Sequence, residues 1–113
     1  KAPHVKVIAA EPNPKHRIQG LKNMQEAIVP GIYDPKGFDR TIHVADEDAF
    51  EMARRLAHEE GLFVGMSSGA AMWAALAAAE ELGEGAVAVI FPDRGDRYLS
   101  TNLFRSVCGE CPP

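Results

Sequence analysis

The stretch Gly65-Met66-Ser67-Ser68-Gly69 has the residue types in this sequence best suited to chemistry. We expect a strand to enter it and a helix, residues 70–82, to leave it. Glycines let a backbone approach a ligand closely, and free N–H groups at a helix start attract electron-rich atoms. The stretch could therefore hold a phosphate or offer a hydroxyl to a ring nitrogen. Equally, Ser67 or Ser68 could simply be the N-cap of the helix.

Three common motifs are excluded at this turn. It lacks the lysine of a nucleotide phosphate loop and the glycine spacing of a dinucleotide fingerprint. It also differs from the Gly-x-Ser-x-Gly of a serine hydrolase, so a nucleophilic serine is not indicated.

A second group of polar residues, Pro92-Asp93-Arg94-Gly95, follows an apolar run at residues 86–91. Asp93 could contact a ligand, because it comes directly after a predicted buried strand. For Asp96 and Arg97 we expect a solvated turn with exposed ion pairs, which contribute little to stability.

The remaining metal-ligand residue types do not form a site in the sequence. No two histidines have ligand spacing on one element, so a metal site is not expected. Cys108-Gly109-Glu110-Cys111 has the form of half a zinc knuckle or of a redox pair, but two further ligands are not nearby. We expect residues 105–113 to form a flexible tail, with the roles of its two cysteines left open.

The elements that must position these residues alternate between strands and helices. An irregular stretch covers residues 15–37, with a helical turn expected around residues 21–27. The predicted helix 46–60 has Asp46 as N-cap and Gly61 as stop. Such an order predicts an α/β fold with a mostly parallel sheet and flanking helices. In that fold, residues 11–12, 65–69 and 92–95 leave strand ends at one edge of the sheet. The predicted strands are residues 5–10, 40–44, 62–64 and 86–91, and the predicted helices are residues 46–60 and 70–82.

Composition bounds the function further. The 113 residues are 46% hydrophobic and 25% charged, which is typical of one globular domain. A net charge of −4 argues against nucleic-acid binding, and no apolar run approaches the roughly 18 residues of a membrane helix. Without a recognisable signal peptide or a disulfide framework, we expect a cytoplasmic protein. Because the chain opens at Lys1 without methionine, we expect either that its start has been removed or that it is a piece of a longer protein.

Four pieces of sequence follow one another along the chain. They are Val-Ile-Ala-Ala-Glu-Pro at 7–12, Ile-Gln-Gly at 18–20, Glu-Glu-Gly at 59–61 with Gly-Met-Ser-Ser-Gly-Ala-Ala at 65–71, and residues 91–104 around Pro-Asp-Arg-Gly-Asp-Arg-Tyr-Leu-Ser-Thr. In this order and at these spacings they resemble the C-terminal part of cysteine synthase (O-acetylserine sulfhydrylase) and its cystathionine β-synthase relatives, which are fold-type-II enzymes that use pyridoxal 5'-phosphate. The resemblance covers roughly Val5 to Phe104, so residues 1–104 are expected to be a C-terminal α/β fragment of such an enzyme.

The resemblance implies roles for six residues. Ser67 would hydrogen-bond the pyridine nitrogen of the cofactor, and Pro92 and Asp93 would line its ring. Gly20, Leu21 and Lys22 would lie beside the substrate. At Lys22 the sequence departs from the A-type pattern Gly-Ile-Gly-Ala-Gly-Phe and is closer to the Gly-Ile-Arg-Arg of B-type and O-phosphoserine-using enzymes.

The resemblance also implies a reaction and partners. Sulfide would replace the leaving group of O-acetylserine or O-phosphoserine to give cysteine, in a homodimer without nucleic acid or membrane. The family's Schiff-base lysine and phosphate loop should lie upstream of Lys1, so these residues alone are expected to be inactive and to leave the cofactor unbound. Alternatives are a cystathionine β-synthase or a threonine/serine dehydratase-type lyase, or a non-enzymatic α/β module that binds an anion at residues 67–69.

Overall fold

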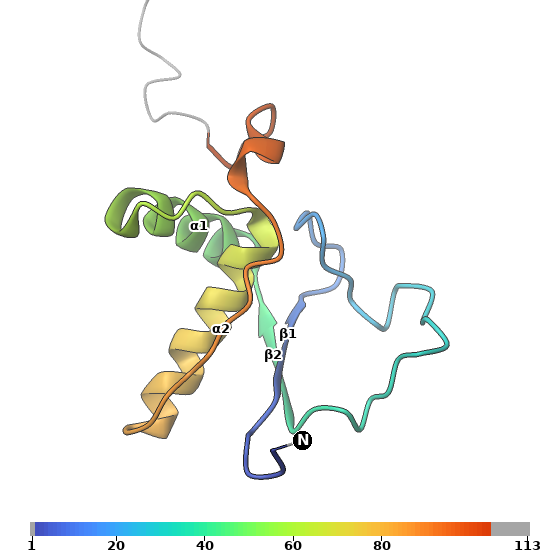
Figure 1. Cartoon of the computed structure of the whole chain (residues 1–113). Coiled ribbons are helices and arrows are strands. Elements are labelled where there is room, and N and C mark those ends of the chain that lie inside the picture. The colour runs from blue at the N-terminus through green and yellow to red at the C-terminus, as the bar shows by residue number, and fades with distance from the viewer. Residues whose placement is uncertain (1, 105–113) are drawn as a thin grey trace, which may run out of the picture.

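A computed structural model of the protein describes residues 2–104. Figure 1 shows both helices on one side of a pair of strands and a long loop, residues 13–39, on the other. The expected tail at 105–113, with Cys108 and Cys111, lies outside the described residues. The elements are β1 (Ile8–Pro12), β2 (Arg40–Val44), α1 (Asp46–Glu60), α2 (Met66–Leu82) and a short 3-10 helix, η1 (Gly95–Tyr98).

The two strands pair in parallel, which confirms the predicted α/β class with a parallel sheet. Ile8 lies opposite Arg40, and Pro12 lies opposite Val44. The first strand begins three residues later than predicted and includes Glu11 and Pro12, which were expected to end it. A proline is tolerated there because β1 is an edge strand and the next residue, Asn13, supplies the N–H that donates to the Val44 carbonyl of β2.

Two predicted strands are absent from the described residues, so those predictions were wrong. In the segment 62–64, Val64 makes only an isolated antiparallel bridge with Arg94. The segment 86–91 joins no ladder, and its Val87 and Ile90 side chains are 45% and 82% exposed. An apolar run becomes a strand only where a neighbour completes its hydrogen bonds, and β1 and β2 pair with each other instead.

Helix α1 has the predicted bounds, with three acidic residues in its first turn where the helix dipole favours them. It ends at Gly61, whose φ of 68° and N–H bond to the Leu56 carbonyl are typical of a glycine cap. The predicted N-cap was wrong. Ala45 occupies that position, and Asp46 instead accepts a hydrogen bond from the backbone N–H of Arg17.

Helix α2 begins at Met66, four residues earlier than predicted. Its cap is the backbone of Gly65, with no side-chain hydrogen bond, so neither Ser67 nor Ser68 is the N-cap. The glycine at 69 has a packing reason. A Cβ there would lie 2.0 Å from the Ala49 carbonyl oxygen of α1, so a residue without a side chain is needed for the two helices to approach this closely.

The main core lies between the two helices and β2, with contributions from the loop after β1 and from the end of the described chain. Ile18 and Leu103, which are far apart in sequence, are 1% and 0% exposed. A smaller cluster of Met52, Leu56 and Val64 packs against Phe91. Among residues 2–104, the helices are all too short or too polar to span a membrane.

Candidate functional site

Ser67 and Ser68 lie in the first turn of α2, and both are buried, with exposed fractions of 2% and 0%. The first N–H groups of a helix have no partner within the helix, and the aligned peptide dipoles give this end a partial positive charge. The Ser68 hydroxyl is enclosed and has no hydrogen-bond partner in the described part of the chain. The sequence prediction of two hydroxyls at a helix start is therefore confirmed, although they lie inside the helix rather than before it.

Gly20 lies directly against Ser67. Its φ of +90° is a conformation that L side chains rarely adopt, and a Cβ at this position would lie 3.3 Å from the Ser67 hydroxyl oxygen. The neighbouring Ile18 is almost fully buried, which holds this part of the loop on the core. The structure thus brings together one residue predicted to lie beside the substrate and the serine predicted to contact the cofactor.

The Asp93 segment meets α2 at the residue before the helix. The N–H of Gly65 donates to the Asp93 carbonyl at 3.3 Å, and the N–H of Gly95 donates to the Phe63 carbonyl at 3.0 Å. Segments 63–65 and 93–95 therefore run antiparallel beside each other. Within the predicted pair of cofactor residues, Asp93 is half-buried and Pro92 is exposed.

Tyr98 is a site residue that the sequence analysis missed. Its hydroxyl donates a hydrogen bond to Asp93 Oδ2, and the residue is 5% exposed. Burial, and then the hydrogen bond to Asp93 and the charge of that carboxylate, raise the pKa of Tyr98 to about 12. A tyrosine in an otherwise polar run, five residues after an aspartate, is the one signal in the sequence that could have pointed to it.

Leu21 and Lys22, which follow Gly20 in the loop, lie in different environments from it. Leu21 is half-buried and packs against the core, whereas Lys22 is exposed. Lys22 lines an open cavity of about 330 Å³ together with His16, Asn23 and Glu26, and Ser67 is not part of its lining. Of the three predicted substrate residues, only Gly20 is placed against Ser67.

The loop that carries Gly20 is attached to the end of β1. The Asn23 side chain donates to the Pro12 carbonyl at 2.8 Å, and Glu11 accepts from the backbone N–H of Met24 at 3.1 Å. A helical turn starting at Asn23 confirms the turn predicted for residues 21–27. The sequence analysis placed residues 11–12 at the same edge of the sheet as residues 65–69 and 92–95. In the structure, residues 11–12 are connected to the start of α2 only through the loop that carries Gly20.

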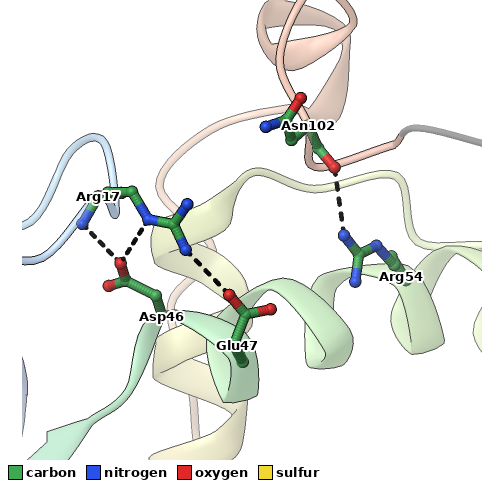
Figure 2. A network of polar contacts seen from close by, with 5 residues as sticks. All are labelled: Arg17, Asp46, Glu47, Arg54 and Asn102. Carbon is green, nitrogen blue, oxygen red and sulfur yellow. Dashed lines mark hydrogen bonds and ion pairs between the residues drawn. The ribbon is translucent and has the colours of Figure 1, made fainter.

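Two arginines fix the flanking segments to α1, as Figure 2 shows. Arg17 donates to Asp46 at 3.2 Å and to Glu47 at 2.9 Å, which ties the Gly20 loop to the start of α1. Arg54, in the middle of α1, donates to the carbonyls of Asn102 at 3.2 Å and Leu103 at 2.7 Å. Both contacts join residues far apart in sequence, so charge patterning could not have predicted them.

Known proteins resemble this chain in sequence and in fold. The family model described as "Pyridoxal-phosphate dependent enzyme" matches residues 1–93. The cysteine synthase of Aquifex aeolicus is 47% identical over 107 residues, which cover 90% of this chain and 33% of that protein. The crystal structure of a cysteine synthase from Entamoeba histolytica superposes with a TM-score of 0.80 at 37% identity, covering 88% of this chain and 32% of the other.

A third relative has a different name. The O-acetylserine dependent cystathionine beta-synthase from Helicobacter pylori gives a TM-score of 0.80 at 36% identity, covering 91% of this chain and 36% of that structure. The chain spans about a third of the length of the relatives it matches. The matches confirm the predicted fold, a fragment of the fold of the fold-type-II enzymes. From the family model and these relatives it follows that the chain belongs to the pyridoxal-phosphate dependent enzyme family.

Proposed function

We propose that this chain forms part of a cysteine synthase, in which sulfide replaces the leaving group at Cβ of O-acetylserine or O-phosphoserine. The observation that carries the proposal is the position of Ser67, buried in the first turn of α2 with Gly20 against its hydroxyl. The 47% identity to the cysteine synthase of Aquifex aeolicus supports it. The substrate is then an activated serine, the second reactant is sulfide, and the assembly is a homodimer.

The residues present fit the aromatic ring of pyridoxal 5'-phosphate. A hydroxyl at a helix start is a suitable partner for a ring nitrogen, and glycine at position 20 leaves the space beside that hydroxyl free of a side chain. In this proposal Ser67 holds the nitrogen, Pro92 and Asp93 line the ring, and Gly20 and Leu21 face the amino acid. When bound, the cofactor supplies an electron sink for negative charge at the substrate Cα.

The neutral side chain of Ser67 suits a replacement reaction. A hydroxyl does not keep the ring nitrogen protonated as a carboxylate would, so Ser67 makes the bound ring a moderate sink rather than a strong one. Loss of a leaving group from Cβ needs less charge at Cα than transfer of the amino group does. Ser67 therefore favours β-elimination and β-replacement over transamination.

The 113 residues are proposed to be inactive on their own and to bind no cofactor. None of the five lysines matches the family's Schiff-base lysine, so no amine is available to bind the cofactor covalently or to remove the Cα proton. The lysines are Lys1, Lys6, Lys15, Lys22 and Lys36.

A chimera tests the proposed function. These residues replace the matching third of the Aquifex aeolicus cysteine synthase, and cysteine formation is assayed with sulfide and either O-acetylserine or O-phosphoserine. The proposal predicts an active, cofactor-loaded chimera, and no activity for the 113 residues alone. A folded, loaded chimera that forms no cysteine from either substrate contradicts it.

Lys22 is proposed to meet an anionic leaving group or sulfur donor. Lys22 is exposed and lines the 330 Å³ cavity together with His16. In the chimera, Lys22→Ala should reduce turnover of O-phosphoserine more than turnover of O-acetylserine, because only the first keeps a charged phosphate. Equal losses on both substrates contradict this role.

A second candidate activity follows from the comparison with the Helicobacter pylori structure, named an O-acetylserine dependent cystathionine beta-synthase, which superposes as well as the cysteine synthase does. The same assay decides between them when an amino-acid thiol is offered beside sulfide. A chimera that prefers the thiol favours this second activity. The family match favours either enzyme over a module that only binds an anion.

A further inference from the structure

We propose that Tyr98 is a positioning residue, whose hydroxyl orients the Asp93 carboxylate against Gly65 and so holds segment 92–98 at the start of α2. The inference deepens the proposed function and rests on it, because Asp93 and Ser67 are the residues assigned there to the cofactor. It adds a residue that acts through the Asp93 carboxylate.

The two oxygens of the Asp93 carboxylate have different surroundings. The Tyr98 hydroxyl donates to Oδ2. The other oxygen, Oδ1, is enclosed without a hydrogen-bond partner and lies 2.2 Å from where a Cβ of Gly65 would be. The ring of Tyr98 closes the same space, with Cε2 2.4 Å from that point. The carboxylate is therefore fixed between a phenol and a glycine backbone, and any side chain at position 65 would displace it.

The same residues connect Asp93 to Ser67. Gly65 is both the cap of α2 and the donor to the Asp93 carbonyl, and Ser67 follows two residues later in the first helical turn. Tyr98 itself is held by η1 and by the core, since it is 5% exposed and its carbonyl accepts from the Thr101 N–H at 3.0 Å. A rigid phenol thus sets where the 92–93 segment lies relative to the serine.

The ionisation of the Tyr98 hydroxyl distinguishes a positioning role from a role in filling space. If Tyr98 only filled space, its ionisation would not depend on the side chain at position 93. If the hydrogen bond to Asp93 holds, both that bond and the negative charge keep the phenol protonated, against a smaller opposing effect of Arg97. Replacing Asp93 by asparagine removes the charge, and the phenol should then ionise at lower pH.

The first experiment measures tyrosine ionisation by ultraviolet absorbance in the 113-residue chain. Tyr33→Phe is the background, since the chain has two tyrosines and this change leaves Tyr98 as the only one reporting. With Asp93 in place the midpoint is expected at about 12, and with Asp93→Asn it should move to lower pH but stay above the ordinary value of 10, because burial, the largest cause of the shift, remains. An unchanged midpoint overturns the proposal. Circular dichroism at each pH confirms that the fold persists over the range compared.

The second experiment tests whether the start of α2 moves when the contact between Tyr98 and Asp93 is changed. Backbone amide resonances of Gly65 and Ser67 are compared at neutral pH in Tyr98→Phe, Asp93→Asn and the matched control Tyr33→Phe. Both site variants should shift the two amides, and the control should not. If Tyr98→Phe does not fold, Asp93→Asn, which keeps the ring, gives the decisive reading. Unmoved amides overturn the proposal, and because neither readout uses cofactor or sulfide, that result is distinct from failure of the cysteine synthase assay.

Discussion

The start of α2, residues 65–70, contains the predicted site residue Ser67, and the segment 86–91 leads to the predicted site residue Pro92, yet the two stretches lie in opposite environments. Residues 65–70 are all buried, whereas Ile90 is 82% exposed. A helix makes its own backbone hydrogen bonds, so α2 needs only side-chain packing, which α1 and the two strands supply. A strand depends on neighbours for every ladder bond, and within the described residues 86–91 has none.

This difference in burial shows which site residues are held in place by contacts within the described part of the chain. Gly20, Ser67, Gly65 and Asp93 are joined by contacts within residues 2–104. The apolar faces of Val87 and Ile90 are not covered in that part of the chain. The site residues therefore rest on the helix pair, while the run that leads to Pro92 is held by few contacts of its own.

The largest expected effect on stability comes from disrupting the contact between α1 and α2 at Gly69. Gly69→Ala places a Cβ 2.0 Å from the Ala49 carbonyl oxygen, so α1 and α2 must separate. We expect the free energy of unfolding to fall by about 3 kcal/mol, the upper part of the range for overpacked cores. Urea denaturation measures it. Gly31→Ala is the control, because open space surrounds that position. A Gly69→Ala chain as stable as the parent contradicts the helix contact.

A pH effect of slightly smaller size tests the buried tyrosine. The pKa of Tyr98 is raised to about 12 from an ordinary value of 10, so the folded state keeps the proton more tightly than the unfolded chain does. Its stabilising contribution is complete below pH 10 and is lost as the pH rises through 12. The expected loss approaches about 3 kcal/mol, since the pKa differs by about two units and one unit corresponds to about 1.4 kcal/mol. In Tyr98→Phe this loss of unfolding free energy between pH 10 and pH 12 should disappear. A loss of the same size in the variant would show that Tyr98 is not its source.

A smaller effect is expected where the Gly20 loop joins α1. Arg17→Ala removes ion pairs to Asp46 and Glu47 from a side chain that is 65% exposed. Exposed pairs contribute little, so we expect a loss of about 0.5 kcal/mol in thermal unfolding at low salt. The loss should shrink at 1 M salt, where charges are screened. Arg17→Lys, which keeps the charge, is the matched variant, and a salt-independent loss would rule out the ionic origin.

The smallest expected effect on stability concerns Ile90, in the exposed segment 86–91. Ile90→Lys should change the free energy of unfolding by less than about 0.5 kcal/mol, because the side chain is already in water. It should instead reduce self-association, which exposed apolar patches promote. Sedimentation velocity and urea denaturation read the two quantities together. A loss of stability above about 1 kcal/mol would show that Ile90 is packed after all.

The parts of the fold that local signals specify were predictable from the sequence. The bounds of α1 followed from its acidic first turn and Gly61, and β2 from its short apolar run. The segments 62–64 and 86–91 were mispredicted because apolar character indicates burial but cannot supply a pairing strand. At the site, the resemblance named Ser67 and Gly20, and the structure adds their contact. The roles of Gly69 and Tyr98 depend on which distant residues meet them, so no local pattern could reveal them.

The central claim is the proposal that Ser67, at the start of α2, contacts the cofactor when these residues are part of a complete enzyme. The most direct measurement compares Ser67→Ala with Ser68→Ala in the Aquifex chimera, by cofactor affinity and by cysteine formation. The two serines are adjacent and both buried, but only Ser67 lies against Gly20. Loss of one hydrogen bond predicts a weakening of roughly 3- to 10-fold for Ser67→Ala and no change for Ser68→Ala. Equal effects of the two changes, or a larger effect of Ser68→Ala, would contradict the claim.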